Sequence, residues 1–171
     1  MEKVSTMFYH RKLFAAAIGV ATLAAAPASA ATVTASASVN VVKPVQLTKL
    51  GDLNFGTVTF AGGSSGSATV TISQLGAVTC PAGATCTGTP AAARFNIQGT
   101  NKMTALLTVP STTLSNGTDS MTFTPVAPAS VYLPNSGAPG IDFAVGGSIS
   151  IGAANAGGTY SGSISVTAEY Q

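Results

Sequence analysis

The chain is poor in the side chains on which most enzymes and nucleic-acid-binding proteins depend. Its 171 residues include no tryptophan and a single histidine, His10, and charged residues make up only 7%. Without a histidine beyond His10, the rest of the chain cannot form a Ser/His/Asp or Cys/His catalytic arrangement. From Ala31 onward four basic residues balance four acidic ones, so a basic surface for nucleic acid or an anionic membrane is missing. We therefore expect neither an enzyme nor a nucleic-acid-binding protein.

Other ligand-binding patterns are also missing. The four carboxylates beyond Ala31 are far apart in sequence, and we interpret Asp119 and Asp142 as ordinary loop residues. No stretch has the spacing of a calcium loop or of a phosphate-binding loop. The lack of tryptophan leaves little material for stacking a sugar. We expect no cofactor and no metal ion.

Cysteine is almost absent as well, with only Cys80 and Cys86, which flank residues 81–85. Two thiols without nearby histidines or carboxylates cannot complete a tetrahedral metal site. A redox motif would have a shorter spacing and a helix start. In an exported protein a close pair is most simply a disulfide bond, and that is our prediction.

Residues 1–30 have the features of a cleaved signal peptide. A basic start is followed by an apolar run from Leu13 to Ala26, which is short for a membrane span. Ala28-Ser29-Ala30 then gives the small-x-small pattern of a cleavage site. We therefore expect an exported protein whose mature chain begins at Ala31 and does not insert into a membrane.

The rest of the sequence favours an all-β fold. Small and β-branched residues dominate, glycine-rich turns recur, and no useful window has helical periodicity. We predict one antiparallel, immunoglobulin-like β-sandwich over 43–171, with about nine to eleven short strands and Greek-key-type connections. The expected strands are 31–42, 45–49, two short pieces around Gly56 within 53–60, 68–73, 94–99, 105–110, 121–124, 131–133, 141–145, 148–152 and 158–171.

Both ends of the predicted mature chain alternate between apolar and polar residues, as half-buried strands do. Residues 31–42 place five apolar side chains on one face: Val33, Ala35, Ala37, Val39 and Val41. The last fourteen residues do the same from Tyr160 onward, with Gly162 among the apolar-face positions Tyr160, Ile164, Val166, Ala168 and Tyr170. A strand this regular is expected to pair with another strand.

The last fourteen residues resemble the final strand of chaperone–usher fimbrial subunits. Such subunits end in alternating apolar residues with a penultimate tyrosine, here Tyr170, and a glycine fourteenth from the end, here Gly158. The chain as a whole is similar to a bacterial family of secreted domains of unknown function that look like fimbrial subunits. The matching pieces are Leu53-Asn-Phe-Gly56, Phe95-Asn-Ile-Gln-Gly99, Val145-Gly-Gly-Ser-Ile149 and Ala156-Gly-Gly-Thr-Tyr-Ser-Gly162.

The resemblance implies a structural protein that polymerises on the cell surface. In such subunits the sandwich lacks its last strand, and the N-terminal strand of the next subunit fills the groove. Residues 31–42 would then be the donor strand, and the final strand, from Gly158 to Tyr170, would line the groove. The implied partners are other copies of the chain and a periplasmic chaperone. Two features depart from the fimbrial pattern: the cysteines are close together, and Ala35 and Ala37 are small for donor residues.

An alternative assigns the same strand a different role. Residues 31–42 could complete the sheet of their own domain, which would make the protein a monomeric secreted module with a binding or envelope role. An ordinary edge strand has the same alternation as a donor strand, so the pattern supports both readings equally.

Overall fold

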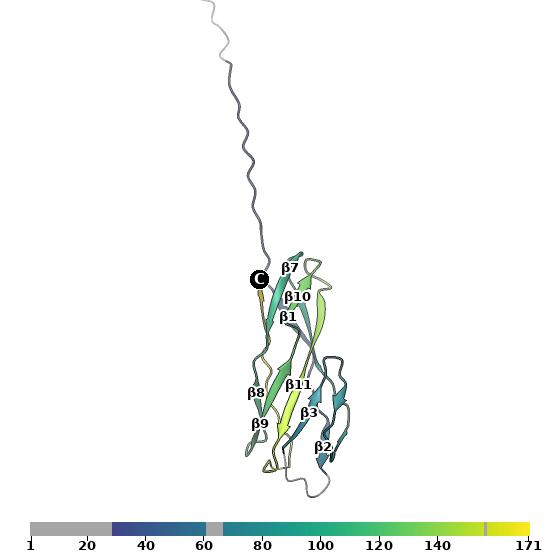
Figure 1. Cartoon of the computed structure of the whole chain (residues 1–171). Coiled ribbons are helices and arrows are strands. Elements are labelled where there is room, and N and C mark those ends of the chain that lie inside the picture. The colour runs from purple at the N-terminus through teal and green to yellow at the C-terminus, as the bar shows by residue number, and fades with distance from the viewer. Residues whose placement is uncertain (1–28, 61–66, 156) are drawn as a thin grey trace, which may run out of the picture. The chain divides into compact units, whose positions relative to one another are not determined.

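The computed structural model describes residues 29–60, 67–155 and 157–171 (Figure 1). The predicted signal peptide lies outside them except for its last two residues, and so do residues 61–66, between two of the predicted strands. The chain divides into two units, residues 1–39 and 40–171. In the first unit, residues 29–39 form neither helix nor strand and every side chain is exposed. The described part of the chain contains no helix long and apolar enough to cross a membrane.

The second unit contains all twelve strands found in the described residues. In chain order they are β1 (Gln46–Gly51), β2 (Thr57–Phe60), β3 (Ala68–Ile72), β4 (Val78–Thr79), β5 (Ala84–Thr87), β6 (Ala93–Gln98), β7 (Met103–Thr108), β8 (Thr112–Ser115), β9 (Ser120–Val126), β10 (Ser130–Leu133), β11 (Ile141–Ile151) and β12 (Thr167–Tyr170).

The strands form three sheets, and all the pairs are antiparallel. The largest has the order β1-β6-β11-β3-β4, and β9 joins it by pairing with β11 and β8. The second has the order β10-β7-β12, so β1 and β12 are edge strands of different sheets. The third is the pair β2-β5. Figure 1 shows β7 and β10 toward one end of this unit and β2 toward the other.

Strand β11 connects the two ends because its halves have different neighbours. Its first half, Ile141 to Val145, pairs with β6, and its second half pairs with β3 and β9. Gly146 and Gly147 lie where the neighbours change. A Cβ on Gly146 would collide with the carbonyl oxygen of Ile72, and one on Gly147 would meet the Phe123 ring at 2.5 Å. Glycine is therefore needed here for the close approach of backbone to backbone and ring.

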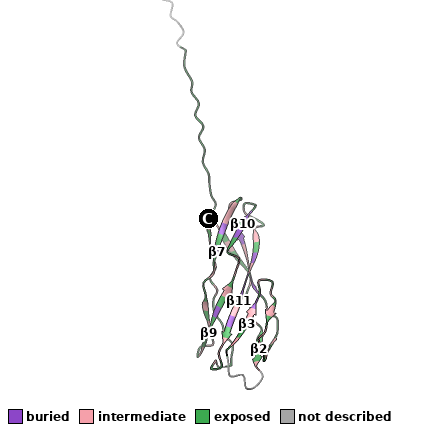
Figure 2. Ribbon diagram, viewed as in Figure 1, coloured by how far each residue is buried: buried purple, intermediate pink, exposed green. Residues whose placement is uncertain are grey.

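Two apolar clusters form the core, and their buried residues alternate along the strands (Figure 2). The first cluster joins β6, β7, β10 and the first half of β11, and includes the fully buried Ile97 and Val145. The second joins β3, β9 and the second half of β11 around the fully buried Val70 and Phe123. Among the described residues, no polar or charged residue is buried, so burial of apolar surface is the main stabilising contribution.

The predicted all-β, antiparallel sandwich is confirmed, but several strand boundaries differ. The segments expected at 141–145 and 148–152 are one strand, β11, because the two glycines between them keep their pairing with β9 and do not interrupt it. Strands β4 and β5, on either side of the cysteine loop, and β8 were not predicted as strands. They are only two to four residues long, so each carries little periodic signal.

The strands expected at residues 31–42 and 158–171 also differ from the prediction. Residues 29–45 form no strand, and residues 29–44 are exposed. Alternation gives a segment strand character, but a strand also needs a partner that supplies hydrogen bonds. The final segment keeps the predicted alternation, with half-buried even positions from Ile164 to Tyr170. Only β12 and an isolated bridge at Ser161 have strand partners.

Candidate functional site: an open groove between two sheet edges

An open groove of about 890 Å³ lies over the second core cluster. One wall is the segment from the end of β1 through β2, which includes Leu53, Phe55 and Val58. The other wall is the final segment from Gly157 to Ile164. The floor includes Met121 of β9 and Ile149 of β11. The groove thus exposes apolar residues that a further layer of structure could cover.

The position of Phe55 is set by the core beneath it. Its ring contacts the buried Phe123 ring edge-on, with the ring centroids 6.1 Å apart. Just before it, Asn54 and Ala91 exchange two backbone hydrogen bonds of 2.8 Å. The Asn54 side chain accepts a third, from the N–H of Gly56. These contacts hold the first wall in place although it has few strand residues.

The second wall is joined to β8 by a single bridge. Ser161 exchanges both backbone hydrogen bonds with Ser115 at the end of β8, at 2.9 and 3.0 Å. Beyond this bridge, Gly162 and Ile164 have no strand partner in the described chain, so their backbone groups are open to an added strand.

The charges at the groove balance each other. Lys49 and Asp52, at its rim, form an ion pair with a distance of 2.8 Å, and both side chains are largely exposed. The other lining residues are apolar, small or uncharged. No three His, Cys, Asp or Glu side chains of the described residues lie close enough to hold a metal ion. The chemistry of the groove suits an uncharged, alternating apolar segment.

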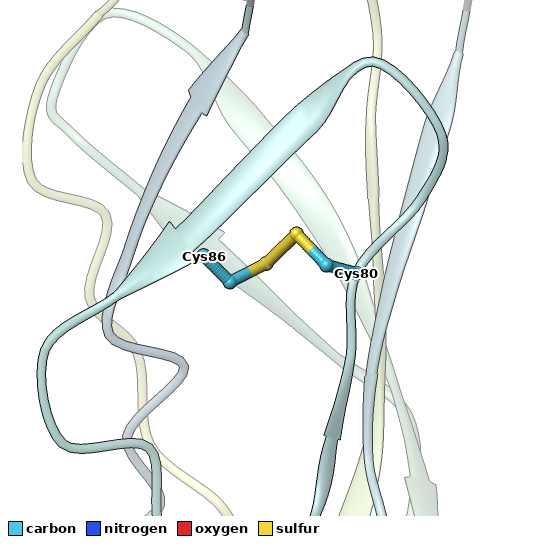
Figure 3. The surroundings of a disulfide bond; sticks show 2 residues. All are labelled: Cys80 and Cys86. Atoms are coloured by element: carbon cyan, nitrogen blue, oxygen red, sulfur yellow. A yellow bond between two sulfur atoms is a disulfide. The ribbon is translucent and has the colours of Figure 1, made fainter.

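The predicted disulfide is present and supports the first wall (Figure 3). It joins Cys80 to Cys86, whose Cα atoms are 6.0 Å apart. Cys86 belongs to β5 and pairs directly with Val58 of β2, which lines the groove. The bond therefore ties the short β2-β5 sheet to the chain that follows β4.

At the other end of this unit, the Tyr170 side chain holds the backbone of Lys43, three residues before β1 begins. Its hydroxyl accepts a hydrogen bond of 2.6 Å from the N–H of Thr100 and donates one of 2.8 Å to the carbonyl of Lys43. The N–H of Lys43 donates to the Thr100 hydroxyl at 2.7 Å. A side chain at position 99 would collide with the Tyr170 hydroxyl, so Gly99 leaves room for this arrangement.

The structure places the predicted site residues in three groups. Those expected to donate are exposed and unpaired, and they are Val33, Ala35, Ala37, Val39 and Val41. Three of the residues expected to accept, Gly158, Tyr160 and Ile164, line the groove. The other three, Val166, Ala168 and Tyr170, pack instead against the first core cluster.

Sequence reasoning missed the opposite wall and the Tyr170 contacts. The alternation of Leu53 and Phe55 indicated a strand, but it did not indicate which side chains would border an opening. Tyr170 forms hydrogen bonds with Thr100 and Lys43, which are 70 and 127 positions away in sequence. No local sequence pattern predicts such contacts.

No curated protein and no solved structure matches the chain significantly. A family model does match: residues 45–170 fit DUF4402, a domain of unknown function. The match covers every strand from β1 to β12 and both walls of the groove. The chain therefore belongs to the DUF4402 family.

Proposed function

We propose that the protein is a non-enzymatic, exported structural subunit that polymerises by strand donation. In this proposal, residues 31–42 of one copy fill the groove of another copy, and the product is a surface fimbria. A chaperone in the periplasm would cover the groove before assembly. The supporting observation is that one chain combines an open groove that has an apolar floor and a mixed polar and apolar lining with an unpaired segment of strand-like alternation.

The side chains of the two parts are compatible. Residues 31–42 carry no charge, and the groove has an apolar floor and a charge-balanced rim. In an extended donor the apolar side chains from Val33 to Val41 would all face the floor. The hydroxyl and amide side chains of the intervening residues would face water.

The backbone of the groove is suited to the same occupant. An added strand gains affinity from main-chain hydrogen bonds and specificity from alternate side chains. Gly162 and Ile164 have no strand partner in the described chain, so their backbone groups would be free to pair with an added strand. The groove wall from Gly157 to Ile164 spans about 26 Å if extended, and residues 31–42 span about 40 Å. The donor is thus long enough to cover the whole wall.

The test uses the chain from Ala31 to Gln171 and two double variants. Val33→Asp with Val39→Asp puts charges on the apolar face of residues 31–42. Thr34→Asp with Ser38→Asp adds the same charge to its polar face and is the matched control. Each concentrated protein is run on denaturing gels with and without boiling. We expect a heat-sensitive ladder from the parent and the control, and none from the valine variant.

A parent that stays monomeric at high concentration would overturn the proposal. Hydrogen exchange then separates the alternatives, because protection of residues 31–42 in a monomer would mean that they complete their own domain. That result would favour the monomeric secreted module with a binding or envelope role.

A further inference from the structure

Hydrogen bonds hold the backbone of Lys43, the residue that follows the unpaired residues 29–42. Its carbonyl accepts the Tyr170 hydroxyl, and its N–H donates to the Thr100 side chain. The Tyr170 hydroxyl is itself anchored by the N–H of Thr100. Pro44 follows, and a residue before proline is restricted to extended conformations. Lys43 is therefore fixed on both sides, whereas residues 29–42 have no strand partner.

The hydrogen bonds of the Lys43 backbone oppose a turn that would reverse the direction of the chain just before β1. A β-turn over residues 43–46 would lead residues 31–42 back along the free edge of β1. With about 40 Å of extended length, they could reach the groove of their own domain. In a turn that begins at Lys43, its carbonyl would accept the N–H three residues ahead. In the structure that carbonyl accepts the Tyr170 hydroxyl instead.

We propose that the Tyr170 hydroxyl is a latch that opposes this reversal and so keeps residues 31–42 available to a neighbouring copy. The inference rests on the proposed function, since it requires that the groove take up this segment. Tyr170 is a positioning residue here: it does not line the groove but determines which copy fills it.

Capture of a labelled peptide measures whether the groove is vacant. The chain 31–171, dilute enough to stay monomeric, is mixed with an excess of a fluorescent peptide of residues 31–42. Captured peptide is read on unboiled denaturing gels. The parent should capture the peptide, and Tyr170→Phe should capture about fivefold less, because loss of the hydrogen bond to the Lys43 carbonyl shifts the balance toward self-occupation. Equal capture by the two chains would overturn the latch.

The control removes self-occupation while retaining the full chain. Val39→Asp puts a charge on the apolar face of residues 31–42, so these residues no longer fill the groove of their own chain. The amount of peptide captured by this variant then depends only on whether the groove itself can bind the peptide. The Val39→Asp chain and the double variant Val39→Asp with Tyr170→Phe should capture equally, which shows that Tyr170→Phe leaves the groove intact. Absence of capture by every chain, including Val39→Asp, would overturn both the proposed function and the latch.

If Tyr170→Phe proves too unstable to measure, Thr100→Val gives the result. This change removes the hydroxyl that accepts the Lys43 N–H and donates to the Lys43 carbonyl at 3.4 Å, so it weakens the same anchor of Lys43 while keeping the backbone N–H that holds Tyr170. Reduced capture supports the latch. Capture equal to that of the parent means that the anchoring of Lys43 does not limit self-occupation, and it overturns the latch.

Discussion

At the scale of single residues, two glycines of the same groove wall differ in what surrounds them. A Cβ on Gly162 would lie 2.5 Å from the Thr113 carbonyl oxygen and 2.8 Å from Leu114 Cδ2. A Cβ on Gly157 would meet nothing within 4 Å. The wall therefore approaches β8 closely at Gly162, where the Ser161–Ser115 bridge lies beside it.

We expect Gly162→Ala to lower the free energy of unfolding by about 1–3 kcal/mol, because the added methyl group pushes the wall away from β8. Gly157→Ala, the matched control, should change it by less than about 1 kcal/mol. Urea unfolding of the two variants measures both effects. Equal stabilities would mean that the wall does not depend on contact with β8.

Residue patterns show how far the sequence alone could predict the site. The alternation from Tyr160 to Tyr170 correctly predicted which side chains face inward, because a period of two has only one inward face. It could not predict that Ile164 borders the groove while Ala168 covers the first cluster, since both have the same local pattern. Their difference depends on which distant strands lie opposite them.

At the scale of elements, the smallest sheet, β2-β5, is held in place partly by the Cys80–Cys86 disulfide bond. The β2-β5 pair is four residues long, and a two-stranded sheet of this size has little stability alone. The Cys80–Cys86 bond and the packing of Val58 and Cys86 on the second cluster hold it in place.

Replacing both cysteines with serine should lower the free energy of unfolding by about 2 kcal/mol on the chain-entropy model. It should also reduce capture of the peptide of residues 31–42, because Val58 lines the groove. Denaturant unfolding and the gel assay measure the two effects. The parent treated with a reducing agent is the control and should behave like the variant. Unchanged capture with reduced stability would show that the wall stays in place without the bond.

Elements also show where prediction from sequence ends. The fold class followed from composition and from the lack of helical periodicity, both of which are averages over many residues. Strand β11 was divided in two because Gly146-Gly147 is a common turn signal, whereas here tertiary crowding by Ile72 and Phe123 requires glycine. Residues 31–42 were predicted as a strand from alternation, but whether they pair depends on a partner that no local pattern specifies.

At the scale of the whole molecule, the part of the chain beyond residue 30 has no net charge. Association of its copies should therefore gain little from electrostatic steering. Raising the salt concentration from about 0.1 M to about 1 M shortens the Debye length from about 10 Å to about 3 Å. We expect the rate of ladder formation to change by less than about threefold over this range. A steep decrease, followed on unboiled gels over time, would show that charged groups guide assembly.

Strand β11 also determines how this unit loses its structure. Its eleven residues contribute Val145 to the first cluster and Ile149 to the second. If one cluster melts, β11 loses half of its hydrogen-bonded neighbours, and the other cluster loses the support of a continuous strand. The two clusters are therefore thermodynamically coupled and should unfold in a single cooperative transition, although the first includes the β10-β7-β12 sheet and the second packs against the β2-β5 sheet.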